Sequence, residues 1–351
     1  PKLLGQAMTA AANCQMNIEL KDNPGARLGV ILGEMAKNGT DKATFVISPR
    51  MASFGSWLEQ LIAESTGKEG KGILPVVGEP LKSPAAYGVD RLFISLQLEG
   101  ERDPLRENSL SALQSAGHPV VRLWMHDLYD LGGQFFTWEF ACATAGYVMG
   151  VNPFDQPNVE SAKASARKMV ADYDAQGSLP LPKPRMTGDG LAVYGDVAGH
   201  TPALMLTNFL KAATPGSYVA IQAYIQQTDA ADVSLLELRE LLMEWLRVAT
   251  TVGYGPRYLH STGQLHKGDA GRGLFVQITS DDRNDVPVPN ELGSSRSSMS
   301  FDVLKEAEAL GDREALMYAG RKVIRFHFKR SIEDALYRLT GELREVLPRT
   351  S

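Results

Sequence analysis

Hydrophobic residues in the first half of the chain follow two spacings, one typical of buried strands and one typical of amphipathic helices. Continuous apolar runs rich in β-branched residues cover residues 43–48, 73–77, 91–97 and 119–124. Between these runs, apolar residues recur every three or four positions, which predicts helices at residues 26–37, 54–65 and 105–116. Because strands that are buried on both faces read as continuous apolar runs, this order predicts a doubly wound α/β domain with a parallel sheet.

The second half of the chain repeats this alternation after a break. Residues 174–190, DAQGSLPLPKPRMTGDG, concentrate proline and glycine without apolar periodicity, which predicts a linker. Beyond it, the pattern predicts helices at residues 201–212, 234–250, 301–309 and in a closing segment that ends near residue 346. Strands are predicted at residues 217–225, 274–279 and 323–328. We therefore expect two domains, residues 1–178 and a smaller α/β extension at residues 179–351.

Composition and charge indicate a globular protein that does not bind nucleic acid. The chain has 351 residues, 44% hydrophobic and 22% charged, which is close to the average for globular proteins and enough for two cores. Its formal charge of −5 is spread along the chain, without a basic stripe or interleaved aromatic residues. Since nucleic-acid binding needs such a positive surface, we expect no nucleic-acid partner.

The two cysteines and the amino-terminal residues bear on the cellular location of the protein. Cys14 and Cys142 stand alone in apolar helical patterns, which favours a reducing, cytoplasmic location. The start, PKLLGQAMTAA, lacks the order of a signal peptide, and no apolar run approaches the ~18 residues of a membrane span, so we expect no membrane partner. A chain that opens on Pro1 within a helical pattern is expected to be part of a longer polypeptide, although removal of an initiator Met before proline would also explain it.

A carboxylate stands out in the helix predicted at residues 54–65. The apolar positions of this helix form one stripe that faces the core: Phe54, Trp57, Leu58, Leu61 and Ile62. Glu64 lies at the edge of this stripe. Gly67 is expected to end the helix in a left-handed conformation, which would put Glu64 in the last turn. Partial burial and the negative end of the helix dipole both raise the pKa of a carboxyl group, as a general base near neutral pH requires. Alternatively, Glu64 caps a neighbouring helix or pairs with Lys68 or Lys71.

The residue order of this segment favours a catalytic role for Glu64. WLEQLIA followed by ESTGK resembles the catalytic segment of the phosphoglucose isomerase family, in which an E-S-x-G-K motif carries the base that moves a proton between C2 and C1 of a sugar phosphate. The resemblance implies a sugar-isomerase domain of the SIS type and makes Glu64 the general base. It also implies substrate contacts for Ser65, Gly67 and Lys68.

A second segment, NPFDQPNVESAK at residues 152–163, resembles another signature of the same family. There the lysine that ends the motif reaches the active site, which implies a catalytic role for Lys163 and a substrate contact for Gln156. Periodicity also places Lys163 on one helical stripe with Val159, Ala166 and Val170. A lysine on an apolar stripe can instead extend its ammonium group to water.

A third segment, GYGPRYLHSTGQLHKGD at residues 253–269, resembles the LHSxGQ motif that holds an active-site histidine in one branch of the family. This resemblance makes His260 the third catalytic residue, with Gln264 and His266 as substrate contacts and His266 as the rival histidine. In the family the motif stands between the other two signatures, whereas here it follows them. We therefore expect the second domain or a neighbouring subunit to return the histidine to the site. An ordinary glycine-rich surface turn is the alternative.

Two further family features are absent from the sequence. It contains neither an S-K-[ST]-x-x-[ST] phosphate loop nor a G-G-R-[FY]-S segment with the enediolate-stabilising arginine. Together with YDLGGQFFTWEF at residues 129–140, the motifs most resemble the isomerase part of transaldolase/glucose-6-phosphate isomerase fusions. The expected partners are thus a sugar phosphate substrate, a missing amino-terminal half of the isomerase, a transaldolase domain and a second copy in a homodimer.

Other chemistries are less well supported by the motifs. GxGxxG and Walker motifs are absent, which argues against nucleotide binding. His260 and His266 lack a placed carboxylate, so we expect no metal and no cofactor. The remaining alternative to a glucose 6-phosphate/fructose 6-phosphate isomerase is a non-catalytic sugar-phosphate-binding SIS module, which the missing phosphate loop favours for the isolated chain.

Overall fold

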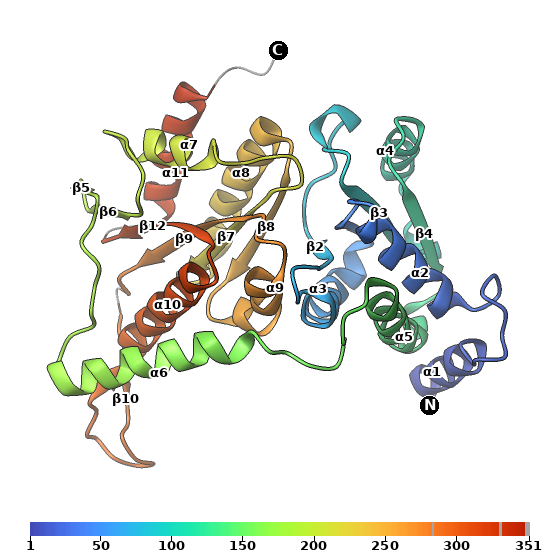
Figure 1. Cartoon of the computed structure of the whole chain (residues 1–351), viewed down its shortest axis with the longest axis horizontal. Coiled ribbons are helices and arrows are strands. Elements are labelled where there is room, and N and C mark those ends of the chain that lie inside the picture. Colours follow the sequence, from blue (N-terminus) through green and yellow to red (C-terminus); the bar gives the residue numbers. More distant parts are fainter. Residues whose placement is uncertain (283, 330–331, 348–351) are drawn as a thin grey trace. The chain divides into compact units, whose positions relative to one another are not determined.

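The computed structural model describes residues 1–282, 284–329 and 332–347, and of residues 159–162 it describes the backbone. Contacts divide the chain into two compact units (Figure 1): Pro1–Pro157 with Ser261–Ala270, and Asn158–His260 with Gly271–Ser351. The division falls within the NPFDQPNV segment, earlier than the linker that the sequence predicts. The domain boundary between residues 178 and 179 stays a prediction.

The first unit is built on a parallel sheet, as the sequence predicts. Its strands are β1 (Lys42–Ile47), β2 (Leu74–Val76), β3 (Arg91–Leu98) and β4 (Val120–Met125), in the order β2-β1-β3-β4. The pairs β1–β2, β1–β3 and β3–β4 are all parallel. Every residue of β3 is buried, which explains why this strand reads as an uninterrupted apolar run. The predicted α/β class with a parallel sheet is confirmed.

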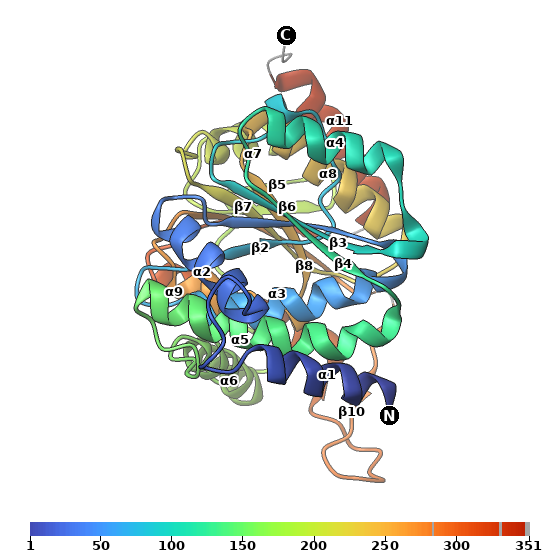
Figure 2. The ribbon, with the colours of Figure 1, turned by 90° about the vertical axis from the view of Figure 1, so that its right-hand side faces the viewer.

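Helices cover both faces of this sheet. They are α1 (Lys2–Asn13), α2 (Pro24–Lys37), α3 (Ala52–Thr66), α4 (Pro104–Ser115) and α5 (Leu131–Met149). Figure 2 shows α4 on one side of β3 and β4, and α1, α3 and α5 on the other. Local sequence explains the ends of these helices: Asn23 caps α2, accepting from the Ala26 amide with Pro24 in the first turn, and Gly150 ends α5 with a positive φ of 68°. Trp138 of α5 is fully buried against Phe45 of β1.

The second unit has a mixed sheet in the order β5-β6-β12-β9-β7-β8. Its strands are β5 (Met186–Gly188), β6 (Leu191–Tyr194), β7 (Tyr218–Tyr224), β8 (Ala249–Tyr254), β9 (Gly273–Ser280) and β12 (Lys322–Phe328), and a small ribbon pairs β10 (Pro287–Val288) with β11 (Met299–Ser300). The pairs from β12 to β8 are parallel, whereas β5–β6 and β6–β12 are antiparallel. The second sheet is therefore also the core of an α/β unit.

The helices of the second unit pack on opposite faces of its sheet. They are α6 (Val159–Gln176), α7 (Pro202–Leu210), α8 (Asp229–Leu246), α10 (Phe301–Tyr318) and α11 (Ile332–Val346). Helices α7, α8 and α11 share one apolar core with alternate residues of β7, β9 and β12. Figure 1 shows α6 alongside α10, and α10 meets the other face, where Gln277 of β9 donates to the carbonyl of Ala309 at 3.0 Å.

Two predicted helices are wrong at their carboxyl ends. The helix expected at residues 301–309 continues as α10 to Tyr318. The sequence predicts a helix over residues 234–250, but α8 stops at Leu246 and residues 249–254 form β8. Arg247 turns the chain with a positive φ of 56°, which ends the helix. β-Branched residues of ATTVGY then pair in parallel with β7. Among the described residues, each helix is too short or too polar to cross a membrane.

Candidate functional site

Glu64 lies in the last turn of α3, half-buried at the edge of the apolar stripe. Ile62 and Ala63, just before it, are fully buried and fix that end of the helix in the core of the first unit. The carboxylate of Glu64 accepts a hydrogen bond at 2.9 Å from Nε2 of Gln156, which lies 92 positions later in the chain. The structure thus joins the ESTGK motif to the FDQ motif through two predicted site residues.

Gly67 ends α3 for a reason other than the one that the sequence predicts. Its φ is −80°, so the expected left-handed conformation is wrong. A Cβ atom on Gly67 would instead lie 2.4 Å from Cα and 2.5 Å from Cβ of Leu265. Glycine is needed here because the backbone of the third motif approaches too closely for any side chain.

The third motif contacts the first through polar groups as well. Gln264, which is fully buried, donates from Nε2 to the carbonyl of Gly67 at 2.8 Å. The amide of Gly70 donates to the carbonyl of Gly268 at 2.9 Å. Both contacts come from α9 (Gly263–Gly268), a short helix that belongs to the first unit. The STGQLHKG segment therefore packs on the ESTGK loop, although almost 200 residues separate the two in sequence.

Two lysines of the ESTGKEGK segment contact the end of α5 and the chain that follows it. Nζ of Lys68 donates to the carbonyl of Asn152 at 2.7 Å and to the backbone carbonyl of Asp155, and it pairs with the Asp155 carboxylate at 3.1 Å. Nζ of Lys71 donates to the carbonyls of Met149 at 2.9 Å and Gly150 at 3.2 Å. Sequence reasoning did not single out Asn152 or Asp155, and the N-P-F-D order, typical of a turn, was the available signal.

The other candidate residues divide between the two units. Ser65 is half-buried in α3, and His266 is almost fully buried in α9, with 2% of its surface exposed. Lys163 of α6 and His260, at the end of the short helix Arg257–His260, are exposed and belong to the second unit. The meeting of Lys163 and His260 with Glu64 in one active site stays a prediction.

The stripe that the sequence predicts for α6 is present beyond Lys163. Ala166 packs so closely on α10 that a Cβ on Gly311 would lie 2.6 Å from the Ala166 amide nitrogen. Met169 and the half-buried Val170 continue this contact with Ala307 and Leu310 of α10. Val159, the first predicted member of the stripe, lies outside the residues whose side chains are described.

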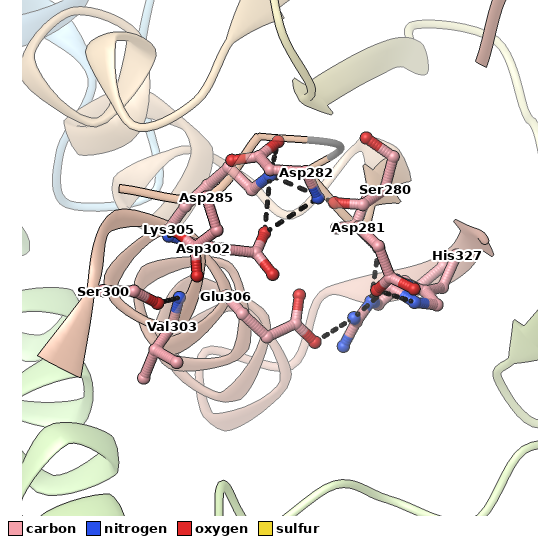
Figure 3. Close-up of polar contacts among 12 residues, drawn as sticks. Ser280, Asp281, Asp282, Asp285, Ser300, Asp302, Val303, Lys305, Glu306 and His327 are labelled. Atoms are coloured by element: carbon pink, nitrogen blue, oxygen red, sulfur yellow. Dashed lines mark hydrogen bonds and ion pairs between the residues drawn. The ribbon is translucent and has the colours of Figure 1, made fainter. Parts of the chain in front are cut away.

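A separate polar cluster lies at the end of β9 in the second unit (Figure 3). Its carboxylates face basic groups: Asp282 and Asp302 face Lys305, Glu306 faces Arg325, and Asp281 lies 3.1 Å from His327. Lys305 also donates to the carbonyl of Ser280 at 3.0 Å. Nζ of Lys305 therefore contacts oxygens of three residues, Ser280, Asp282 and Asp302. Within the described part of the chain, His, Cys, Asp and Glu side chains do not gather in groups of three or more that could hold a metal ion.

Comparison with known proteins supports the resemblance expected from the motifs. The chain is 29% identical to glucose-6-phosphate isomerase of Enterococcus faecalis in an alignment of 202 residues that covers 47% of this chain and 44% of that protein. It is 31% identical to glucose-6-phosphate isomerase of Bacillus cytotoxicus in an alignment of 193 residues that covers 44% of this chain and 43% of that protein. The chain thus spans less than half the length of these relatives, and its similarity to glucose-6-phosphate isomerases is confirmed over that part.

Protein-family profiles and solved structures were also compared with the chain. No protein-family profile matches the chain. Among solved structures, a glucose-6-phosphate isomerase from Chlamydia trachomatis matches with 12% identity and a TM-score of 0.29, covering 97% of this chain and 72% of that one.

Proposed function

We propose that this chain carries part of the active site of an aldose-ketose isomerase that interconverts glucose 6-phosphate and fructose 6-phosphate. Glu64 removes the C2 proton of the opened sugar, a cis-enediol forms, and the same carboxylic acid returns a proton at C1. The hydrogen bond from Gln156 to Glu64 is the observation that carries this proposal, because it unites two motifs of the isomerase resemblance around one carboxylate. The relatives named glucose-6-phosphate isomerase give further support.

The remaining candidate residues take supporting roles in this proposal. Lys163 and His260 assist ring opening and handle the ring and C1 oxygens. Ser65, Gly67, Gln156, Gln264 and His266 line the substrate. Aldose-ketose exchange by proton transfer needs a well-placed base and no redox cofactor, which fits the residues of the three motifs.

The proposal also concerns the rest of the protein. The phosphate loop and the arginine that the sequence lacks are supplied by the remainder of a longer polypeptide, which includes an isomerase half and a transaldolase domain. The protein acts as a homodimer in the cytoplasm, as part of glycolysis and gluconeogenesis. The match to less than half of each relative's length supports the part of this proposal that concerns a further isomerase portion.

A coupled assay of the full-length protein with fructose 6-phosphate tests the role of Glu64. Glu64→Gln keeps the side-chain shape and removes the base, so we expect kcat to fall by about 10²- to 10⁴-fold. Glu69→Gln, five positions later in the same segment and exposed, is the matched control and should leave kcat unchanged. Equal rates for wild type and Glu64→Gln would contradict the assignment.

The same assay distinguishes isomerase activity from the second candidate function, which is a sugar-phosphate-binding module without catalysis. The absence of a phosphate loop from the sequence favours that function for the isolated chain. It predicts a full-length protein that binds fructose 6-phosphate in calorimetry but does not convert it. An active wild type that loses its activity on Glu64→Gln would exclude it.

A further inference from the structure

Lys68 is a fully buried lysine beside the proposed catalytic base. A lysine ammonium group has three N–H donors, and burial requires that they be paired. Nζ of Lys68 meets three acceptors: the carbonyl of Asn152 at 2.7 Å, the backbone carbonyl of Asp155, and the carboxylate of Asp155 at 3.1 Å. These three acceptors match the three donors, so in this arrangement no donor remains for a substrate phosphate.

The segment that Lys68 holds is a compact turn. The amide of Phe154 donates to Oδ1 of Asn152 at 3.1 Å, and Nδ2 of Asn152 donates to the carboxylate of Asp155 at 3.2 Å. Side-chain bonds of this kind replace ordinary backbone pairing in turns. The ammonium group of Lys68 closes the turn by binding both of its ends.

The residue after this turn is Gln156, whose Nε2 donates to Glu64 at 2.9 Å. Lys68 thus fixes the backbone directly before the side chain that contacts the base. Lys68 and Glu64 also lie four positions apart, at either side of the end of α3. Loss of the ammonium group would take this donor from the carbonyls of Asn152 and Asp155 and would release the turn.

We propose, on the basis of the proposed function, that Lys68 is a positioning residue that holds the Asn152–Asp155 turn so that Gln156 orients the carboxylate of Glu64. This role replaces the substrate contact expected from the sequence. It makes the lysine of the ESTGK motif the link between the first and second motifs. Its effect on the reaction passes through Gln156.

Lys71 provides a matched control. It lies three positions later, and its Nζ donates to the carbonyls of Met149 and Gly150 at the end of α5. It therefore anchors the same loop to the same part of the chain, but at residues that do not adjoin Gln156. The side chain of Lys71 is exposed, whereas that of Lys68 is buried. A general contribution of lysine contacts to this part of the backbone should be common to Lys68→Met and Lys71→Met, whereas an effect on Glu64 should be confined to Lys68→Met.

A double-mutant cycle in the full-length protein tests the proposal. Lys68→Met and Gln156→Leu should each lower kcat by about tenfold to hundredfold, the range expected for a lost hydrogen bond to a charged group. Lys68→Met should leave KM little changed, because Lys68 itself does not contact the substrate. The double variant should be no slower than the slower single variant, because both changes remove the same interaction with Glu64.

The pH profile of kcat/KM gives a second readout. Its acidic limb should move to higher pH in Lys68→Met and in Gln156→Leu, because the side-chain amide of Gln156 favours the ionised form of the Glu64 carboxylate. Lys71→Met should show none of these effects.

The opposite results would overturn the proposal. A Lys68→Met variant with raised KM, unchanged kcat and an effect additive with Gln156→Leu would instead place Lys68 on the substrate. Should Lys68→Met not fold, Asp155→Asn weakens the same contact at a half-exposed side chain and should likewise lower kcat without adding to Gln156→Leu. Additivity of Asp155→Asn with Gln156→Leu would also contradict the proposal.

A readout without catalysis separates this inference from the proposed function. Carbon-13 NMR of labelled glutamate follows the titration of the Glu64 carboxylate whether or not the protein is an isomerase. An upward movement of its midpoint in Lys68→Met and Gln156→Leu, but not in Lys71→Met, supports the positioning role. An unchanged midpoint overturns it, while equal activity of wild type and Glu64→Gln overturns the proposed function alone.

Discussion

Glu64 illustrates what a single residue's surroundings add to its place in a pattern. The sequence predicts a carboxylate at the edge of an apolar stripe in the last turn of a helix, and the structure confirms that position. Its contact with Gln156 could not be predicted from periodicity, because the two residues are 92 positions apart and meet through the turn after α5. The family resemblance identified both residues, and the fold supplies the hydrogen bond between them.

His327 is the residue for which we predict a pH effect on stability. Burial, reinforced by the Arg325 guanidinium, lowers the pKa of His327 below its ordinary 6.5, although Glu306 and Asp281 oppose this. Because the unfolded chain then binds a proton more readily than the folded one, stability is lost as pH falls below about 6.5 towards the folded-state pKa. His327→Gln should therefore flatten the decline of the unfolding free energy between about pH 7 and pH 5, measured by urea titration.

The control for His327 is His200, an exposed histidine of the same unit. His200→Gln should leave the pH dependence of the unfolding free energy as in wild type. An equally steep decline in His327→Gln and wild type would contradict the assigned pKa direction. Since His327 donates or accepts at Thr279 and Asp281, glutamine can keep a polar contact in its place.

At the scale of elements, the parallel strands were the most predictable part of the fold. β1 and β3 are buried along almost their whole length, so continuous apolar runs define their positions closely. The end of α8 was not predictable in the same way. Apolar residues continue from α8 into β8, and only the turn at Arg247 separates the two elements. Arg247 adopts a left-handed conformation, which an arginine in the sequence does not predict.

The contact between the end of α3 and α9 gives a prediction at the element scale. Gly67→Ala puts a methyl group 2.4 Å from the backbone of Leu265, so the loop and α9 must move apart. We expect a loss of about 1–3 kcal/mol in the free energy of unfolding, the usual cost of overpacking. Hydrogen exchange at the Gly70 amide, which donates to Gly268, should become faster because α9 is displaced.

Gly100→Ala is the matched control for this substitution. A Cβ on Gly100 has no neighbour within 4 Å, and its φ lies outside the range that demands glycine. The unfolding free energy and the exchange of the Gly70 amide should both stay near the wild-type values. A Gly67→Ala variant as stable as Gly100→Ala would show that α9 does not constrain the loop.

At the scale of the whole molecule, the return of the third motif to the first unit is the feature that sequence could least predict. The displaced order of the motifs led to the expectation that the second domain or another subunit returns the histidine. The structure places Ser261–Ala270 in the first unit, against the ESTGK loop, while His260, directly before this segment, belongs to the second unit. Such an arrangement depends on tertiary packing over almost 200 residues, for which local patterns carry no information.

The most direct test of the account is the fate of the substrate proton in deuterated water. With glucose 6-phosphate, the full-length wild-type protein should form fructose 6-phosphate with solvent deuterium at C1, because the proton held by Glu64 exchanges with solvent before it is returned. Proton NMR of the product measures this incorporation. Glu64→Gln should form product and incorporate deuterium about 10²- to 10⁴-fold more slowly. Incorporation at the wild-type rate in Glu64→Gln would contradict the claim that Glu64 is the base.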